Sequence, residues 1–257
     1  METRLLLADD ALTGASVGEL ASGDLHVWCV SLQALGPVDR WRRTLDPEEC
    51  ARAGRYHFER DRDLFIIGRG VLRTILSGYL QCEPVDLDFG YGSSGKPALA
   101  GAFVASPLRF NLSHSAGLAL YAVTLNREIG IDIEYNRSTL VVESLVERYF
   151  SKREAAAFRV LPADKRRQAF FRSWTCKEAC LKATGDGLTA PLDRVEVGFD
   201  GDGPARLLAI DGDKKAAAGW SLRELQPAFN YAAALAVQGL LGRLLWRRWP
   251  QSSNQPD

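Results

Sequence analysis

The chain has no excess of charge of either sign and no long apolar run. Its 257 residues include 32 lysines and arginines and 32 aspartates and glutamates, so the formal net charge is zero. This balance removes the general electrostatic argument for nucleic-acid binding. No apolar run reaches the length that crosses a bilayer, and Leu5–Leu7 is too short a run for a signal peptide. We therefore expect a cytoplasmic protein that binds neither nucleic acid nor membrane.

Cysteine is scarce, and its spacing excludes two common kinds of site. The five cysteines are odd in number and include no C-x-x-C pair, which argues against a disulfide framework and against a zinc site. Cys176 and Cys180 lie one helical turn apart, where we expect two small buried side chains. The chain also lacks the complete Walker loop of many nucleotide-binding proteins.

Apolar alternation and capping signals predict a chain that mixes strands and helices. Helix starts are indicated at Asp46 and Ser151, each followed three residues later by the glutamate of a capping box. Helical periodicity covers 141–161, with a break at Phe150. The predicted strands are 25–30, 110–115, 117–124, 130–134, 194–199, 206–210, 220–225 and 231–237.

The order of these elements predicts an α+β fold built from two halves. Strand, helices and strands occur in that order twice, and the two sets meet near residue 126. We assign 1–125 to an N-terminal half, 126–240 to a C-terminal half and 241–257 to a tail. The tail is basic and amphipathic, and we interpret it as a short terminal helix or a frayed segment rather than a membrane-surface helix. Residues 250–257 are expected to be disordered.

Arginines recur along a helix predicted downstream of Asp46. Arg62, Arg69 and Arg73 are seven and four residues apart, which places them near one face of the helix. A solvated basic face explains this pattern without any ligand. A row of contacts to an anion is the alternative.

Two loop segments carry polar groups of uncertain role. The glycine-rich segment 90–97 is a turn by itself, although its Lys96 could close on a phosphate. His114 is one of only three histidines, and it sits at the end of a predicted strand between Ser113 and Ser115. A lone histidine is more often structural, but the end of a strand is a place where side chains reach a cleft.

The strand at 130–134 carries two carboxylates on one face. Alternation places Asp132 and Glu134 on one side, with Ile131 and Ile133 on the other. Two neighbouring carboxylates repel each other unless a cation neutralises them, and Mg²⁺ prefers oxygen ligands. An exposed strand face with two solvated acids is the simpler alternative.

The helix predicted over 170–182 presents an unusual row of side chains. Trp174, Glu178 and Lys182 are four residues apart and share one face, and glycines at 185 and 187 close the helix. Taken alone, Glu178 and Lys182 fit a surface ion pair that contributes a few tenths of a kcal/mol. Trp174 would then pack beneath that pair.

Taken together, these segments resemble one family. Gly130-Ile131-Asp132-Ile133-Glu134, followed some forty residues later by Trp174-Thr175-Cys176-Lys177-Glu178-Ala179 and Lys182, resembles the paired signature of the 4′-phosphopantetheinyl transferases. The arginine helix, Gly95-Lys96-Pro97 and Asn111-Leu112-Ser113-His114-Ser115 point to the larger, Sfp-type branch. The resemblance covers roughly residues 45–240.

The resemblance implies a pseudo-twofold pair of α/β halves with coenzyme A held in the cleft between them. Such enzymes move the phosphopantetheine arm of coenzyme A to a serine of an apo carrier protein and release adenosine 3′,5′-bisphosphate. By position, the Mg²⁺ ligands would be Asp132, Glu134 and Glu178, and the catalytic residues Glu178 and Lys182. The residues that bind coenzyme A would be Arg62, Arg69, Arg73, Lys96, Pro97, Ser113, His114, Asp132 and Lys182.

Several alternatives remain open at this stage. Glu178 would take the serine proton directly or through a metal-bound water. A non-catalytic protein that binds coenzyme A or a nucleotide, and a Mg²⁺-dependent phosphohydrolase, are rival functions. The carrier is not named by the sequence and could serve fatty-acid synthesis, polyketide or peptide assembly, or a carrier-dependent reductase. A monomer is expected, because both halves of the family fold lie in one chain.

Overall fold

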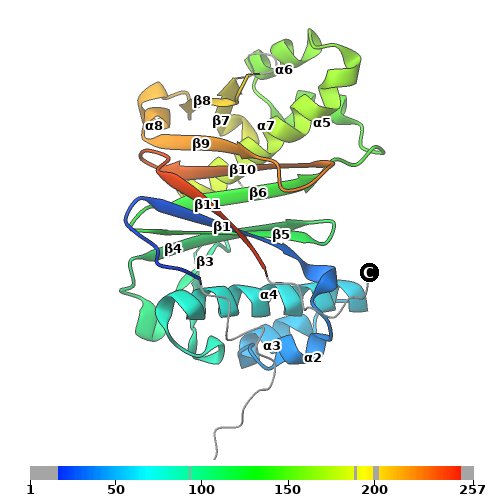
Figure 1. Ribbon diagram of the computed structural model, residues 1–257. Coiled ribbons are helices and arrows are strands. Elements are labelled where there is room, and N and C mark those ends of the chain that lie inside the picture. The colour runs from blue at the N-terminus through cyan, green and yellow to red at the C-terminus, as the bar shows by residue number, and fades with distance from the viewer. Residues whose placement is uncertain (1–16, 93, 188–189, 199–202, 250–257) are drawn as a thin grey trace, which may run out of the picture. The chain divides into compact units, whose positions relative to one another are not determined.

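The α+β fold of the chain consists of two compact units. The computed structural model describes residues 17–92, 94–187, 190–198 and 203–249. Among these described residues, one unit comprises residues 17–19, 30–87 and 248–249, and the other comprises residues 20–29 and the described part of 88–247. Figure 1 shows the helices and strands of each. This division differs from the sequence-based halves, which remain a prediction.

The first unit is helical. Its elements are η1 (Leu32–Ala34), α2 (Val38–Arg42), α3 (Pro47–Ala53), α4 (Glu59–Leu80) and η2 (Pro84–Asp86). The predicted capping box starts α3, because the Asp46 side chain accepts from the Glu49 amide while the Glu49 side chain accepts from the Asp46 amide. Against α4, Trp41 of α2 packs so closely that a Cβ at Gly70 would lie 2.8 Å from its ring.

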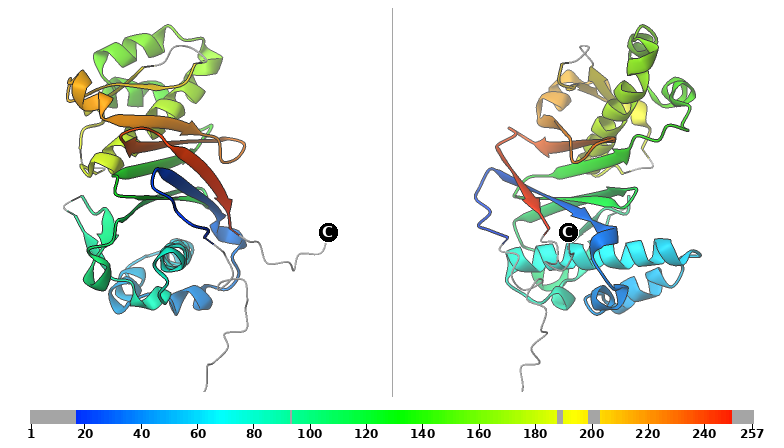
Figure 2. Two further views of the ribbon diagram at one scale, coloured as in Figure 1. Left: turned by 60° about the vertical axis from the view of Figure 1, so that its left-hand side comes forward. Right: turned by 45° about the vertical axis from the view of Figure 1, so that its right-hand side comes forward.

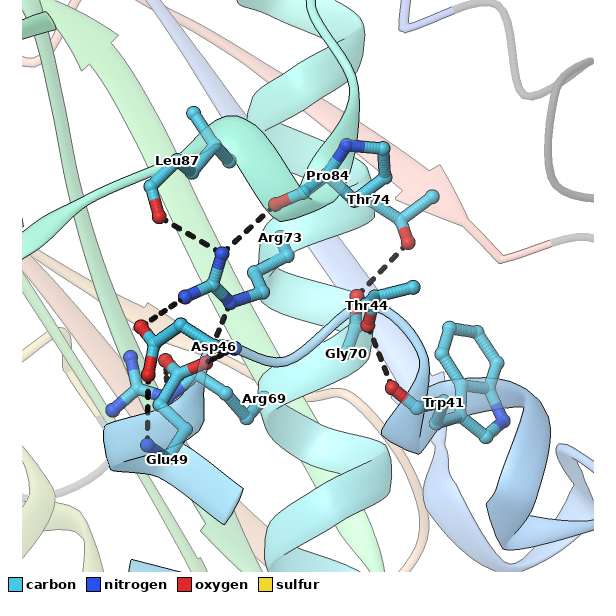
Figure 3. Close-up of polar contacts among 10 residues, drawn as sticks. All are labelled: Trp41, Thr44, Asp46, Glu49, Arg69, Gly70, Arg73, Thr74, Pro84 and Leu87. Carbon is cyan, nitrogen blue, oxygen red and sulfur yellow. Dashed lines mark hydrogen bonds and ion pairs between the residues drawn. The ribbon is translucent and has the colours of Figure 1, made fainter. Parts of the chain in front are cut away.

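The same two capping residues hold α4 in place through a buried arginine. Arg73 is 0% exposed, and its guanidinium donates to Glu49 at 2.6 Å and to Asp46 at 2.5 Å. It also donates to the carbonyls of Pro84 and Leu87 at 2.9 and 2.8 Å (Figure 3). Arg69 adds an ion pair to Glu49 at 3.1 Å. One cap therefore joins α3, α4 and the segment around η2.

The second unit contains the sheets. A four-stranded sheet has the order β11-β1-β5-β4, a three-stranded sheet has the order β6-β10-β9, and β2-β3 and β7-β8 form two-stranded ladders. The strands are β1 (Asp24–Ser31), β2 (Phe89–Tyr91), β3 (Pro97–Leu99), β4 (Leu108–Ser115), β5 (Leu118–Leu125), β6 (Ile129–Tyr135), β7 (Val195–Gly198), β8 (Arg206–Ile210), β9 (Trp220–Leu225), β10 (Tyr231–Gln238) and β11 (Arg243–Arg248).

The remaining helices belong to this unit. They are η3 (Gly101–Phe103), α5 (Val142–Tyr149), α6 (Lys152–Arg159), α7 (Ala163–Thr184), η4 (Leu192–Arg194) and α8 (Lys214–Ala218). The long helix α7 packs along β6 and β10, as Figure 2 shows. It ends at Gly185, which adopts the left-handed conformation (φ 84°) that favours glycine.

Two apolar cores lie on opposite faces of β6 and β10. Ile131 and Ile133 of β6 are 0% exposed and cluster with Leu25 and Val27 of β1 and Leu120 of β5. The opposite face of β10 packs against α7 residues that include Cys176 and Cys180. The predicted alternation of β6 is thereby confirmed, because its isoleucines enter one core while Asp132 lies on the side of α7.

The C-terminal half of α7 is anchored by a buried ion pair. Lys177 is 0% exposed and donates to Glu154 of α6 at 2.8 Å and to the carbonyls of Leu192 and Val195. Glu154 in turn accepts from the Val197 amide at 2.8 Å. Since both charges are paired and hydrogen-bonded, breaking the pair would leave an uncompensated buried charge.

Most predicted elements are confirmed, and one is wrong. The strands at 25–30, 110–115, 117–124, 130–134, 206–210, 220–225 and 231–237 match β1, β4, β5, β6, β8, β9 and β10. The strand predicted over 194–199 corresponds to β7, although Phe199 lies outside the described residues. The tail forms strand β11 beside β1 rather than a helix, because the edge of β1 supplies backbone partners that a periodic pattern does not reveal.

Two further expectations concern cysteines and membrane spans. Cys176 and Cys180 are buried, as expected. In the part of the chain that the structure describes, no helix combines the length and the apolar character needed to span a bilayer. The predicted disorder of 250–257 falls outside the described residues.

We predict that replacing Arg73 with methionine lowers the free energy of unfolding by about 3–5 kcal/mol, because the carboxylates of Asp46 and Glu49 lose their buried partner. Urea denaturation followed by circular dichroism measures the change. Arg60→Met, at an exposed position on the same helix, is the control and is expected to cost less than about 0.5 kcal/mol. Equal costs for the two variants would contradict a structural role for Arg73.

Candidate functional site

The candidate site is built where α7 crosses β6 at a glycine. A Cβ at Gly130 would lie 2.1 Å from the Ala179 carbonyl oxygen and 2.4 Å from the Ala183 amide nitrogen. Only glycine permits so close an approach of a helix backbone to a strand. Because Glu178 and Lys182 precede those two alanines, the contact at Gly130 sets how near they come to the carboxylates of β6.

Lys182 lies directly against Asp132. Its ammonium donates to Asp132 Oδ1 at 2.6 Å, to Ser113 Oγ at 3.0 Å and to the Ile131 carbonyl at 3.3 Å. Ser113 also donates its hydroxyl proton to the same carboxylate oxygen at 2.9 Å. The surface pair between Glu178 and Lys182 that the sequence allowed is therefore replaced by a partly buried pair with a strand residue.

Side chains of β4 join that strand to β6. Ser115 donates to Glu134 Oε2 at 2.9 Å and accepts from the Tyr135 amide at 3.1 Å. Asn111 Oδ1 accepts from the Ile131 amide at 2.9 Å. Sequence reasoning missed Asn111 and Ser115 as residues that position the site. Their signal was present in the N-x-S-x-S alternation of 111–115, which sends these three side chains to one face.

Glu178 is the third carboxylate and is 7% exposed. Burial raises its pKa to about 7, and the charges of Asp132 and Glu134 act in the same direction, while Lys182 opposes them. Burial, followed by the charge of Asp132, also raises the pKa of Glu134. Asp132 Oδ2 and Glu178 Oε2 are buried and have no hydrogen-bond partner among the described residues.

The two buried carboxylate oxygens without partners fit a hard cation. Within the described ranges, no group of three or more His, Cys, Asp or Glu side chains is arranged to hold a metal ion. The assignment of Asp132, Glu134 and Glu178 to one cation stays a prediction. Lys182 neutralises Asp132 at one of its two carboxylate oxygens.

The remaining predicted residues of this unit lie around the same helix and strand. Lys96 donates to Glu128 at 3.0 Å and to the carbonyls of Ile129 and Ala183 at 3.2 and 3.5 Å, so it joins the start of β6 to the end of α7. Pro97 begins β3 directly after it. His114 lies exposed at the end of β4. Its pKa is lowered first by desolvation of the imidazole and then by the charge of Lys182.

The three predicted arginines belong to the helical unit. Arg69 and Arg73 are buried and paired with acidic residues of that unit, which favours a structural role for both. Arg62 pairs with its neighbours Glu59 and Asp63 on α4 at 2.9 and 3.0 Å. Its side chain is 30% exposed, so it is the member of the row that a ligand can reach most easily.

Comparison with known proteins identifies the family. A 4′-phosphopantetheinyl transferase N-terminal domain matches residues 38–126, and the 4′-phosphopantetheinyl transferase superfamily domain matches residues 128–236. The 4′-phosphopantetheinyl transferase HetI of Nostoc sp. is 47% identical over 221 residues, which cover 86% of this chain and 90% of that protein. This chain belongs to the 4′-phosphopantetheinyl transferase superfamily.

A second relative supports the resemblance of this chain to the Sfp-type branch of the family. The 4′-phosphopantetheinyl transferase Sfp of Bacillus subtilis is 28% identical over 165 residues, which cover 64% of this chain and 71% of that protein. Among solved structures, the holo-[acyl-carrier-protein] synthase of Neisseria meningitidis aligns with a TM-score of 0.37 and 19% identity. That alignment covers 44% of this chain and 98% of the synthase.

We predict that Glu178 makes the protein less stable as pH rises. The unfolded carboxyl ionises near 4.5, whereas the folded one keeps its proton to about pH 7. The folded state therefore binds more protons between these values, and about 3 kcal/mol of stability present below pH 4.5 is lost by pH 7. Urea unfolding at several pH values, in EDTA to remove metal ions, measures the slope.

Two glutamine variants separate this effect from the titration of the rest of the protein. Glu178→Gln is expected to remove the loss, so that its stability relative to wild type rises between pH 5 and pH 7.5. Glu48→Gln, at an exposed position on α3, is expected to leave the slope unchanged. A Glu178→Gln profile parallel to that of the wild type would show that Glu178 is not the group responsible.

Proposed function

We propose that this protein transfers the 4′-phosphopantetheine arm of coenzyme A to a serine of an apo carrier protein. The observation that carries the proposal is the arrangement of Asp132, Glu178 and Lys182 at the α7–β6 contact, in a chain of the 4′-phosphopantetheinyl transferase superfamily. The proposal includes release of adenosine 3′,5′-bisphosphate as the second product. It also includes a monomeric state, because one chain carries both matched family segments. A cytoplasmic location is a further part of the proposal.

The reaction is a displacement at phosphorus. The carrier serine oxygen forms a bond to the phosphorus on the pantetheine side of the diphosphate, and the bond from that phosphorus to the bridging oxygen breaks. The leaving group is the bisphosphate, and the serine proton must go to a base. Catalysis of such transfers rests mainly on positioning and on neutralising the charge that develops.

Glu178 is suited to take the serine proton. A general base works best when its pKa lies near the working pH, and burial raises the pKa of Glu178 to about 7. Its Oε2 has no hydrogen-bond partner among the described residues. In the cation-free protein at neutral pH, the carboxyl is thus ionised in a large fraction of molecules.

Asp132 and Glu178 would hold the divalent cation, with Glu134 beside them. Buried carboxylate oxygens without partners are suited to a hard cation such as Mg²⁺. A cation held there would neutralise charge on the diphosphate of coenzyme A. Ser113 and Ser115 orient the Asp132 and Glu134 carboxylates by hydrogen bonds.

Positive groups for the phosphates of coenzyme A would be Lys182 and Lys96, with His114 at an accessible position. Pro97 and Ser113 are proposed to line the same region. Arg62 belongs to the helical unit, and its contact with coenzyme A stays a separate prediction. We leave Arg69 and Arg73 out of this set because they are buried and paired with Glu49. The nature of the carrier is left open between acyl, peptidyl and aryl carriers.

The transfer is tested by incubating the protein with coenzyme A, Mg²⁺ and a panel of apo carriers. The expected result is a mass gain of one phosphopantetheine on at least one carrier, with release of adenosine 3′,5′-bisphosphate. Glu178→Gln and Asp132→Ala are expected to lower kcat at least about 10²-fold. Absence of a mass gain on every carrier, or phosphate release from coenzyme A without any carrier, would contradict the proposal.

Gly130→Ala tests the spacing of the site. An added methyl group must push α7 away from β6, because both contacting groups are backbone. We expect a stability cost of about 1–3 kcal/mol and a fall in kcat of about 10²-fold. Mass spectrometry of the carrier measures kcat, and urea denaturation measures stability.

The matched control is Gly90→Ala in β2, where a Cβ would meet only Ala100 at an ordinary 3.7 Å. It is expected to keep kcat within about twofold of wild type. If Gly130→Ala also kept its full kcat while folded, the spacing of α7 and β6 would not govern the reaction.

A further inference from the structure

The Lys182 ammonium already has a full set of hydrogen-bond acceptors in the absence of a ligand. Its ammonium has three N–H groups, and three acceptors surround it: Asp132 Oδ1, Ser113 Oγ and the Ile131 carbonyl. The side chains of Lys182 and Asp132 are only 16% and 6% exposed. Salt screens such a pair less than it screens a surface pair.

The other oxygen of the same carboxylate has no partner. Asp132 Oδ2 and Glu178 Oε2 are the buried oxygens that we assign to a cation, and neither is hydrogen-bonded in the described part of the chain. An ion on Asp132 Oδ2 would share its carboxylate with the ammonium on Oδ1. Because both are positive, each weakens the binding of the other.

We propose that Lys182 is the counter-ion of Asp132 in the coenzyme-free protein and that a divalent cation binds tightly only when this ammonium moves away. The inference rests on the cation site of the proposed function. The diphosphate of coenzyme A offers the displaced ammonium a new anionic partner. The free protein therefore binds the cation weakly, and removing the ammonium strengthens binding even without coenzyme A.

The test measures Mn²⁺ binding to the coenzyme-free full chain by electron paramagnetic resonance. Lys182→Met, which keeps most of the length of the side chain, is expected to bind Mn²⁺ at least tenfold more tightly than wild type. Lys96→Met is the matched control, since Lys96 also contacts the end of α7 but pairs with Glu128. It removes the same charge and is expected to change the affinity less than threefold.

A second measurement uses the wild-type protein and does not depend on the folding of a variant. Acetylation of lysines by an amine-reactive reagent is mapped by mass spectrometry with and without Mn²⁺. The labelling rate of Lys182 is expected to rise at least threefold when Mn²⁺ is present, because the ammonium leaves its three acceptors. The labelling rate of Lys96 is expected to stay the same.

Three outcomes would overturn the inference. They are an unchanged or weaker Mn²⁺ affinity in Lys182→Met, an equal gain in Lys96→Met, and a Lys182 labelling rate that Mn²⁺ does not change. In those cases, Mn²⁺ binding by the wild type would still support the cation site of the proposed function. Absence of Mn²⁺ binding in wild type and in Lys182→Met would overturn both the site and the inference, while carrier labelling tests the transfer reaction separately.

Discussion

The arrangement of the site depends on the contact between a helix backbone and a strand backbone at Gly130. Close packing of α7 on β6 has two effects at once, since it buries Ala179 and Ala183 in an apolar core and brings the residues before them over Asp132. The same geometry that stabilises the second unit therefore also determines the local dielectric of the carboxylates. Low exposure raises the pKa of Glu178 to about 7, which a surface glutamate would not reach.

Burial of charge is the second constraint on this fold, and the protein meets it by giving buried cations several partners. Lys177 is enclosed by Glu154 and two carbonyls, and Arg73 by two carboxylates and two carbonyls. Such groups are costly to desolvate, so they contribute little net stability but a strong preference for one arrangement. For Lys177 the consequence is local, since it fixes the rotation of α7 at the residue next to Glu178.

Much of the fold was predictable from local patterns in the sequence. Both capping boxes, the break at Phe150 and the alternation of β6 involve residues within a few positions of one another, and the structure confirms them. Element order also predicted the α+β class. The division at residue 125 was a guess from element order alone and remains untested.

The errors and omissions come from contacts between distant residues. Arg73 lies 27 residues from Asp46, so its row of arginines gave no sign that it was already paired. The tail has a pattern that suits either a helix or a strand, and pairing with β1 decides for the strand. Likewise, the contact of Lys182 with Asp132 spans 50 residues, whereas the spacing pointed to Glu178 one turn away.

The junction of β4 and β6 has a further consequence for how this chain can vary. At this junction the side chains of Asn111 and Ser115 accept hydrogen bonds from the backbone amides of Ile131 and Tyr135. In a regular strand ladder, backbone carbonyls would be the acceptors. A ladder of carbonyls tolerates almost any sequence, because every residue carries the same backbone groups. Here the alignment of β4 with β6 depends on the side chains of Asn111 and Ser115. Substitutions at 111–115 would therefore loosen the alignment of β6, even if every residue of β6 itself stayed unchanged.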